Sequence, residues 1–125
     1  MTETIDLAIF AASAPLNGAI PPIARINDLE AYVWRFSELP RWEVNPQSDK
    51  LLLVIGGTMR IKIQSADGLD VHMVGPGQMI RIPRDHWHSP EPLGEVSTLT
   101  IANYEGTKTA DAPDRANPKD EPTDQ

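Results

Sequence analysis

The residues best suited to chemistry lie in two short stretches of the chain. Glu43, Asn45 and Lys50 form the first group, and His86 and His88 lie further on. A carboxylate, an amine and an imidazole can move protons on a small substrate when they reach the same atom, within about 3 Å. A lysine can also anchor an anion. Either kind of chemistry requires a fold that brings the two stretches together.

The composition excludes several other kinds of site. The chain has 125 residues, no cysteine and a formal net charge of −7. Without cysteine there are no disulfides, thiolate nucleophiles or Cys-ligated metals, so a metal would have to bind His, Asp, Glu or Asn. The negative net charge and the lack of a Lys/Arg cluster argue against binding to nucleic acid or to anionic membranes.

Short strands separated by turns are expected to position these residues. A short helix is predicted near residues 5–11, and strands are predicted around residues 32–36, 51–55, 59–64, 69–74, 79–82 and 95–102. Gly56-Gly57 is expected to form a tight turn. Arg60, Lys62 and Gln64 alternate with apolar residues and are expected to face solvent. This pattern is typical of an antiparallel sandwich or barrel.

The chain is expected to contain one domain, residues 1–107, followed by a tail. Residues 108–125 carry an excess of acidic over basic residues, three prolines, and no apolar residue larger than alanine. Such a segment cannot bury enough apolar surface to offset the entropy lost on ordering. We therefore predict a flexible acidic tail.

Two stretches resemble the two sequence motifs of the cupin family. Residues 42–50, with the sequence WEVNPQSDK and followed by an apolar strand, are similar to the first motif. Residues 75–88, with the sequence GPGQMIRIPRDHWH, are similar to the second. The resemblance covers residues 5 to about 109 and points to the small single-domain cupins of the mannose-6-phosphate-isomerase-like group. It implies an all-β double-stranded β-helix, a jelly-roll barrel, here with a short N-terminal helix.

The resemblance also implies where a metal would bind, and this chain departs from the family there. In cupins, two histidines and a glutamate of the first motif and one histidine of the second hold a divalent ion. The corresponding residues here are Glu43, Asn45, Lys50 and His88. An ammonium group has no lone pair for a metal, so Lys50 is expected to pair with Glu43 instead. We predict that no metal cofactor is bound.

These residues suggest a metal-independent cupin that binds a small polar or anionic molecule in its barrel. If the protein is an enzyme, proton transfer of the isomerase or lyase kind is expected. Lys50, Glu43 and His88 are then the predicted catalytic residues.

Four further residues are predicted to contact the ligand: Asn45, His86, Arg81 and Trp34. His86 shares a face with His88 if the strand there is regular. The direction of Arg81 depends on the strand register, which the sequence leaves open. For Trp34, packing in the core is the alternative.

Two other functions remain open. One is a metal-dependent dioxygenase or isomerase in which Glu43, His86 and His88 bind a divalent metal such as Zn, Fe, Mn or Ni. The other is a non-catalytic regulatory or partner-binding module whose pocket is filled by its own side chains. The resemblance also suggests a homodimer, for which the apolar segment from Ile5 to Ala12 is a plausible contact. The N-terminus lacks the basic start of a signal peptide, so a cytoplasmic location is expected.

Overall fold

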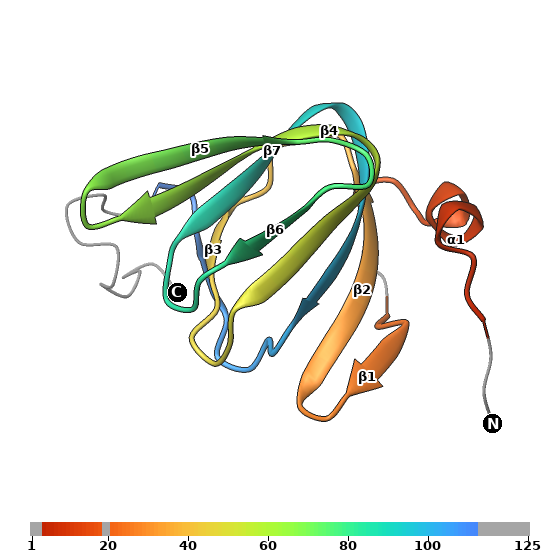
Figure 1. Cartoon of the computed structure of the whole chain (residues 1–125), viewed down its shortest axis with the longest axis horizontal. Helices are drawn as coiled ribbons and strands as arrows, with labels where there is room; N and C mark the ends of the chain where they lie inside the picture. The colour runs from red at the N-terminus through yellow and green to blue at the C-terminus, as the bar shows by residue number, and fades with distance from the viewer. Residues whose placement is uncertain (1–3, 19–20, 113–125) are drawn as a thin grey trace.

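Antiparallel strands form a barrel, and one short helix stands at its side (Figure 1). The structure, a computed structural model, describes residues 4–18 and 21–112. In chain order the elements are α1 (Leu7–Ser13), β1 (Ala24–Ile26), β2 (Leu29–Phe36), β3 (Trp42–Val44), β4 (Lys50–Ser65), β5 (Gly68–Val74), β6 (Met79–Ile82), β7 (His88–Ala102) and β8 (Lys108–Ala110). The predicted all-β architecture with an N-terminal helix is confirmed. In the described part of the chain, no helix is long and apolar enough to cross a membrane.

The two long strands β4 and β7 hold the barrel together. They pair with each other along most of their length. The first part of β4 also pairs with β6 and its second part with β5, while β7 pairs with β2 and β3. Because each of the two long strands pairs with several others, residues far apart in the sequence become neighbours. In this way Glu43 of β3 lies directly opposite His88 of β7.

Gly56 and Gly57 do not form the turn predicted from their sequence. β4 runs through them without ending, and the pairing with β7 shifts register at this point. Gly57 has a φ of 80°, and a Cβ atom added there would meet the carbonyl oxygen of Glu95 in hard contact. The glycine pair therefore bends a continuous strand and allows β7 to approach closely.

Replacing Gly57 with alanine is expected to lower the free energy of unfolding by about 2–3 kcal/mol, because positive φ and steric overlap both oppose a Cβ atom. Gly77 is a matched control, since its φ is 79° but an added Cβ would meet open space. Gly77→Ala is expected to cost only about 1 kcal/mol. Urea denaturation measures both, and equal losses would contradict the steric explanation.

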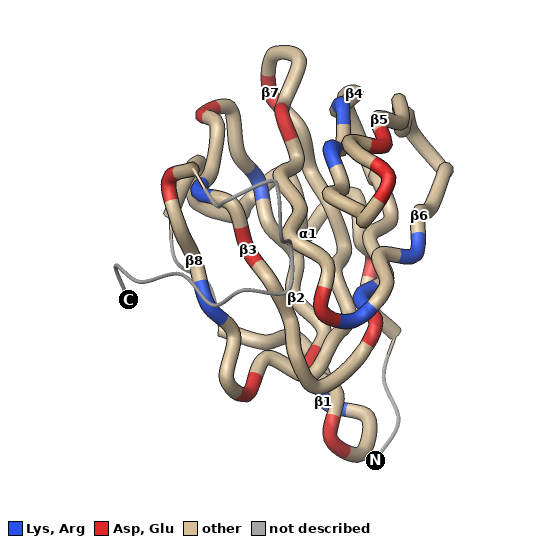
Figure 2. Tube along the Cα trace, turned by 90° about the vertical axis from the view of Figure 1, so that its left-hand side faces the viewer, with Lys and Arg blue, Asp and Glu red and all other residues tan. Residues whose placement is uncertain are grey.

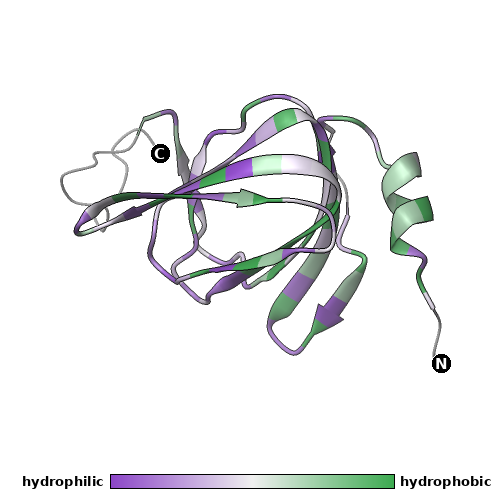
Figure 3. Ribbon diagram, turned by 45° about the horizontal axis from the view of Figure 1, so that its top comes forward, coloured by the Kyte–Doolittle hydropathy of each residue, from purple (hydrophilic) through white to green (hydrophobic). Residues whose placement is uncertain are grey.

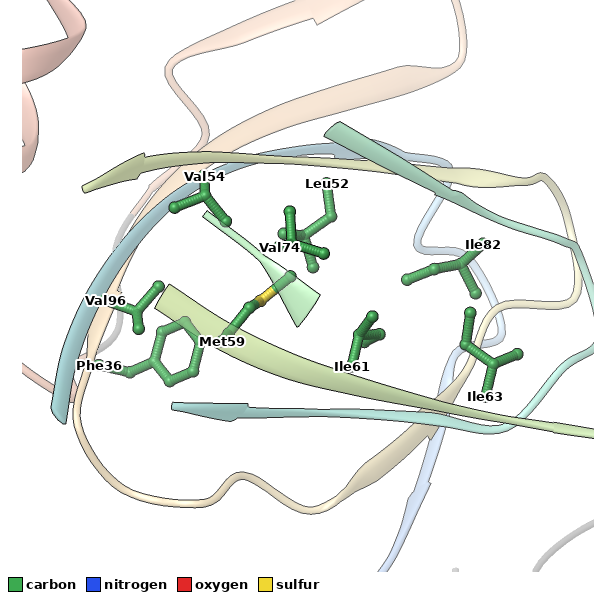
Figure 4. Packing of buried hydrophobic residues seen from close by; sticks show 9 residues of the cluster. All are labelled: Phe36, Leu52, Val54, Met59, Ile61, Ile63, Val74, Ile82 and Val96. Atoms are coloured by element: carbon green, nitrogen blue, oxygen red, sulfur yellow. The ribbon is translucent and has the colours of Figure 1, made fainter. Parts of the chain in front are cut away.

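A continuous apolar core fills the barrel (Figure 4). It is built from nine buried residues on five strands: Phe36, Leu52, Val54, Met59, Ile61, Ile63, Val74, Ile82 and Val96. Figure 3 shows the alternation of hydrophobic and hydrophilic residues along the strands that places one face in this core. Each large aliphatic side chain buried here contributes about 1.5–3 kcal/mol. The core ends at Ile63 and Ile82, which pair with His88 and Lys50.

A second apolar cluster lies around Trp87 and extends the fold beyond the predicted domain boundary. Trp87 packs with Val44 and Ala110, and Trp42 packs against them. Lys108–Ala110 forms β8, which pairs with β3. The boundary predicted at residue 107 therefore lies too early, because pairing with β3 and burial of Ala110 compensate for the polar composition of this segment. Residues 113–125 of the predicted tail lie outside the described residues.

One residue predicted to face solvent is instead buried. Arg60 and Lys62 are partly exposed and form ion pairs with Glu91, as alternation predicts. Gln64 is fully buried, and neither polar atom of its side chain has a hydrogen-bond partner among the described residues. Elsewhere, charged residues of both signs are spread over the strands and loops in the view of Figure 2.

Candidate functional site

The barrel brings together the three residues predicted to be catalytic. Lys50 is the first residue of β4 and shares its inward face with Leu52 and Val54. Its ammonium Nζ donates a hydrogen bond to Glu43 Oε2 at 2.9 Å and lies 3.4 Å from His88 Nε2. Lys50 is only 7% exposed and His88 only 1%. The three form a compact polar cluster at the end of the apolar core.

The hydrogen bonds determine which nitrogen of His88 carries the proton. Its Nδ1 lies 3.0 Å from the backbone carbonyl oxygen of His86. A carbonyl oxygen only accepts, so Nδ1 must donate and Nε2 presents its lone pair to the ammonium group of Lys50. Burial and the positive charge of Lys50 lower the pKa of His88 to about 4. His88 is therefore neutral at pH 7 and accepts a hydrogen bond from Lys50.

Glu43 supplies the negative charge of the cluster. Burial favours a raised pKa, but the charge of Lys50 and the hydrogen bonds from Lys50 and Asn45 outweigh it, so the pKa of Glu43 lies below its usual value. The side chain is 24% exposed, more than that of Lys50. An ionised Glu43 therefore balances Lys50 and is the member of the pair nearest to solvent.

Asn45 is buried and holds Glu43 in place. Its Nδ2 donates to Glu43 Oε2 at 3.1 Å and to Thr107 Oγ1 at 2.9 Å. Because a carboxylate cannot donate, the amide must point its nitrogen toward Glu43. The buried Oδ1 of Asn45 has no partner among the described residues. Thr107, which follows β7 in a loop and belongs to neither motif, was not among the predicted site residues.

Tyr104 and Thr100 form a wall of the cluster that was also missed. Lys50 Nζ lies 5.7 Å from the centre of the Tyr104 ring, within range of a cation–π contact. The Tyr104 hydroxyl donates to Thr100 Oγ1 at 3.0 Å, and burial raises the pKa of Tyr104 above its usual value. Thr100 points inward because it lies opposite Leu52 on the barrel's inner face.

His86 and Arg81 lie apart from the buried cluster, and their contact with a ligand stays a prediction. The residues before β7 are not a regular strand, and Asp85 has a φ of 65°, so alternation does not place His86 on the face of His88. The Nδ1 of His86 instead bonds the carbonyl oxygen of Arg84 at 2.9 Å. Arg81 faces outward from β6 and forms an ion pair with Asp49 at 2.7 Å.

Both residues line a separate open cavity of about 660 Å³ between the free edges of β5 and β6. Its polar lining includes Asp70 and His72 of β5 in addition to His86 and Arg81. Its apolar lining includes Ile63, Val74, Ile80, Met73 and Met79. Because Ile63 pairs with His88, this cavity lies beside the buried cluster. Asp70 and His72 belong to a strand outside both motifs and were not among the predicted site residues.

Trp34 packs against the core, which was the alternative to contact with a ligand. Its ring stacks on Phe36, with centroids 3.9 Å apart and an interplanar angle of 17°. It also packs against the apolar core. The arrangement gives Trp34 a role in the core.

Comparison with solved structures identifies the barrel. A cupin-2 domain protein from Shewanella frigidimarina matches with a TM-score of 0.69 and 19% identity, over 79% of this chain and 93% of that one. A protein from Neisseria meningitidis matches with a TM-score of 0.66 and 24% identity, over 79% and 97%. The chain has the cupin fold. The fold expected from the two motifs is therefore confirmed, while the mannose-6-phosphate-isomerase-like group stays a prediction.

More distant cupins in the same comparison are enzymes. An oxalate oxidase matches with a TM-score of 0.61 and 17% identity, and an oxalate decarboxylase from Lactobacillus farciminis with 0.59 and 14%. This chain corresponds to 46% of the former and 26% of the latter. No protein-family model and no curated protein match the chain. Identities this low establish a shared fold only. Any chemistry has to be inferred from the residues of this barrel itself.

The donor set of this chain does not fit the metal that the cupin fold implies. The positions in question hold Glu43, Asn45, Lys50 and His88, and the ammonium of Lys50 sits where the lone pairs of Glu43 and His88 converge. A second positive charge at that point would be repelled. Among residues 4–18 and 21–112, no three His, Asp or Glu side chains form a group able to hold a metal. The alternative set of Glu43, His86 and His88 is therefore not assembled.

Proposed function

We propose that this cupin binds a small molecule with an apolar body and one anionic group, in the cavity between β5 and β6. The cavity itself carries the proposal: about 660 Å³ is enough for a small ligand, and its wall combines the aliphatic side chains of Ile63, Val74 and Ile80 with polar groups. The guanidinium of Arg81 and the imidazoles of His72 and His86 can hydrogen-bond a carboxylate or a phosphate.

The buried cluster has a different role in this proposal. Lys50 acts as the structural partner of Glu43 beside the core, held by Glu43 and His88 through direct contacts. Lys50 and His88 are almost completely buried, so we expect a ligand in the cavity to bind without contacting them. The isomerase or lyase chemistry expected of Lys50, Glu43 and His88 stays a prediction, and Glu43 is the group that a substrate would reach first.

Benzoate and inorganic phosphate are suitable probes, because the first has both an apolar ring and a carboxylate and the second has only the anionic group. Benzoate is expected to shift the amide NMR signals of β5 and β6 with a millimolar or lower dissociation constant, and phosphate to bind more weakly. Arg81→Gln is expected to weaken benzoate binding about tenfold, because a charge-assisted hydrogen bond is lost. Arg25→Gln is the matched control, since Arg25 is similarly exposed (70% against 64%) and ion-paired but lies outside the cavity.

Three results would contradict the proposal. The first is no shift at β5 and β6 with either probe, which favours the non-catalytic module. The second is equal loss of binding in Arg81→Gln and Arg25→Gln. The third is a stoichiometric transition metal in the purified protein that disappears in His88→Asn, which would restore the metal-dependent alternative.

A further inference from the structure

Asp70 places a carboxylate on the inner face of the barrel. It lies opposite Ile63 in the pairing of β5 with β4, and directly paired residues of neighbouring strands share a face of the sheet. The side chain of Ile63 belongs to the apolar core (Figure 4). Asp70 lines the cavity between β5 and β6, and its side chain forms no ion pair or hydrogen bond within residues 4–18 and 21–112. Its negative charge is therefore open to a ligand.

The positive charges near the cavity are already matched by other carboxylates. Arg81 Nη1 forms an ion pair with Asp49 Oδ2 at 2.7 Å. The ammonium of Lys50 is held by Glu43 at 2.9 Å and is almost completely buried. A ligand that carried only negative charge would gain the remaining N–H groups of Arg81 but would meet the uncompensated charge of Asp70. The cavity thus favours a ligand that also brings a positive charge.

His86 offers a hydrogen-bond acceptor to the same cavity. Its Nδ1 lies 2.9 Å from the carbonyl oxygen of Arg84, and a carbonyl oxygen only accepts, so Nδ1 carries a proton. In a neutral imidazole, Nε2 then holds the lone pair. In the part of the chain that the structure describes, Nε2 has no partner. An ammonium group has three N–H donors, so it suits both Asp70 and this nitrogen.

We propose that the ligand of this cavity is a zwitterion, in which an ammonium group binds Asp70 and a carboxylate binds Arg81. The inference rests on the proposed function, because it concerns the same cavity and names the class of its ligand. Only Nη1 of Arg81 has a partner among the described residues, so Nε and Nη2 are available to the carboxylate. Val74 and Ile80 contact the apolar body. The ligand class is thus an amino acid with an apolar side chain or a longer amino carboxylate.

Four probes separate the two charged groups in an amide NMR titration. Benzoate carries only the carboxylate and benzylamine only the ammonium. Phenylalanine carries both on one carbon, and 4-(aminomethyl)benzoate carries them at opposite ends of its ring, so the two zwitterions cover a short and a long spacing. At least one zwitterion is expected to bind ten times more tightly than benzoate, because a charge-assisted hydrogen bond to Asp70 adds to that from Arg81.

Asp70→Asn removes the charge and keeps the size of the side chain. It is expected to weaken the tighter zwitterion and benzylamine about tenfold, because their ammonium groups lose a charged acceptor. It is expected not to weaken benzoate, which has no ammonium group. Asp67→Asn is the matched control, since Asp67 is an exposed carboxylate in the turn before β5 and lies outside the cavity. This variant is expected to bind all four probes as the wild type does.

The outcomes distinguish this proposal from the proposed function. If benzoate shifts the signals of β5 and β6 but neither zwitterion binds more tightly, the zwitterion is ruled out and the anion-binding cavity stands. Equal effects of Asp70→Asn and Asp67→Asn on zwitterion binding would also overturn the assignment, since Asp70 would then be an ordinary solvated carboxylate. If none of the four probes shifts β5 and β6, both proposals fail.

Discussion

Replacing Lys50 with methionine is expected to lower the free energy of unfolding by about 3–5 kcal/mol at neutral pH. Removing one partner of a buried ion pair leaves the other charge buried without compensation, and this costs about 3–5 kcal/mol. Here the remaining group is Glu43, whose carboxylate would keep only the hydrogen bond from Asn45. Denaturant unfolding at pH 7 measures the loss.

A second variant distinguishes the charge effect from altered packing. Adding Glu43→Gln to Lys50→Met removes the unpaired charge and is expected to recover more than half of the lost stability. Lys62→Met is the matched control, because Lys62 is partly exposed and its ion pair with Glu91 is a surface pair, so a change below about 1 kcal/mol is expected. If Lys50→Met alone were neutral or stabilising, Lys50 would not be the compensating cation of this cluster.

The stability of the protein is expected to fall by about 3 kcal/mol as the pH is lowered from about 6.5 to about 4. The pKa of His88 is lowered to about 4 in the folded state, whereas an unfolded histidine titrates near 6.5. Between these values the unfolded chain binds a proton that the folded chain does not, so acid favours unfolding. Above about pH 6.5 His88 is neutral in both states and its contribution is fully present. The lowered pKa of Glu43 has the same sign and extends the loss to lower pH.

Stability measured by denaturant unfolding at several pH values tests this expectation. His88→Asn is expected to remove most of the slope between pH 6.5 and 4, because the group that binds the extra proton on unfolding is gone. A wild-type stability that stays constant from pH 7 to pH 4.5 would show that His88 titrates normally.

The buried half of the candidate site was predictable because its residues belong to motifs with a known place in the barrel. Glu43, Asn45, Lys50 and His88 were named from the two motifs, and the structure brings all four into contact. What the motifs did not supply was the protonation state of His88, since this depends on the carbonyl of His86 and on the distance to Lys50.

Predictions based on alternation failed where the backbone leaves the regular strand. His86 precedes β7 beside Asp85, whose positive φ turns the chain, so the two-residue period does not apply. Gly56-Gly57 was predicted to form a turn, but β4 continues through both residues because it stays paired with β7. Gln64 was assigned to the solvated face but is buried. In each case the outcome depends on a neighbouring strand that is distant in sequence.

By itself the sequence determined the all-β class, the short N-terminal helix and the departure from the cupin metal set, because these follow from residue period and residue type. The tertiary structure decided which side chains meet. Closing β4 and β7 into one barrel placed Lys50 between Glu43 and His88, and separated Arg81 and His86 from them in the cavity beside β5. Side-chain direction depends on register and on local backbone angles, and both are set by strand pairing between residues far apart in the chain.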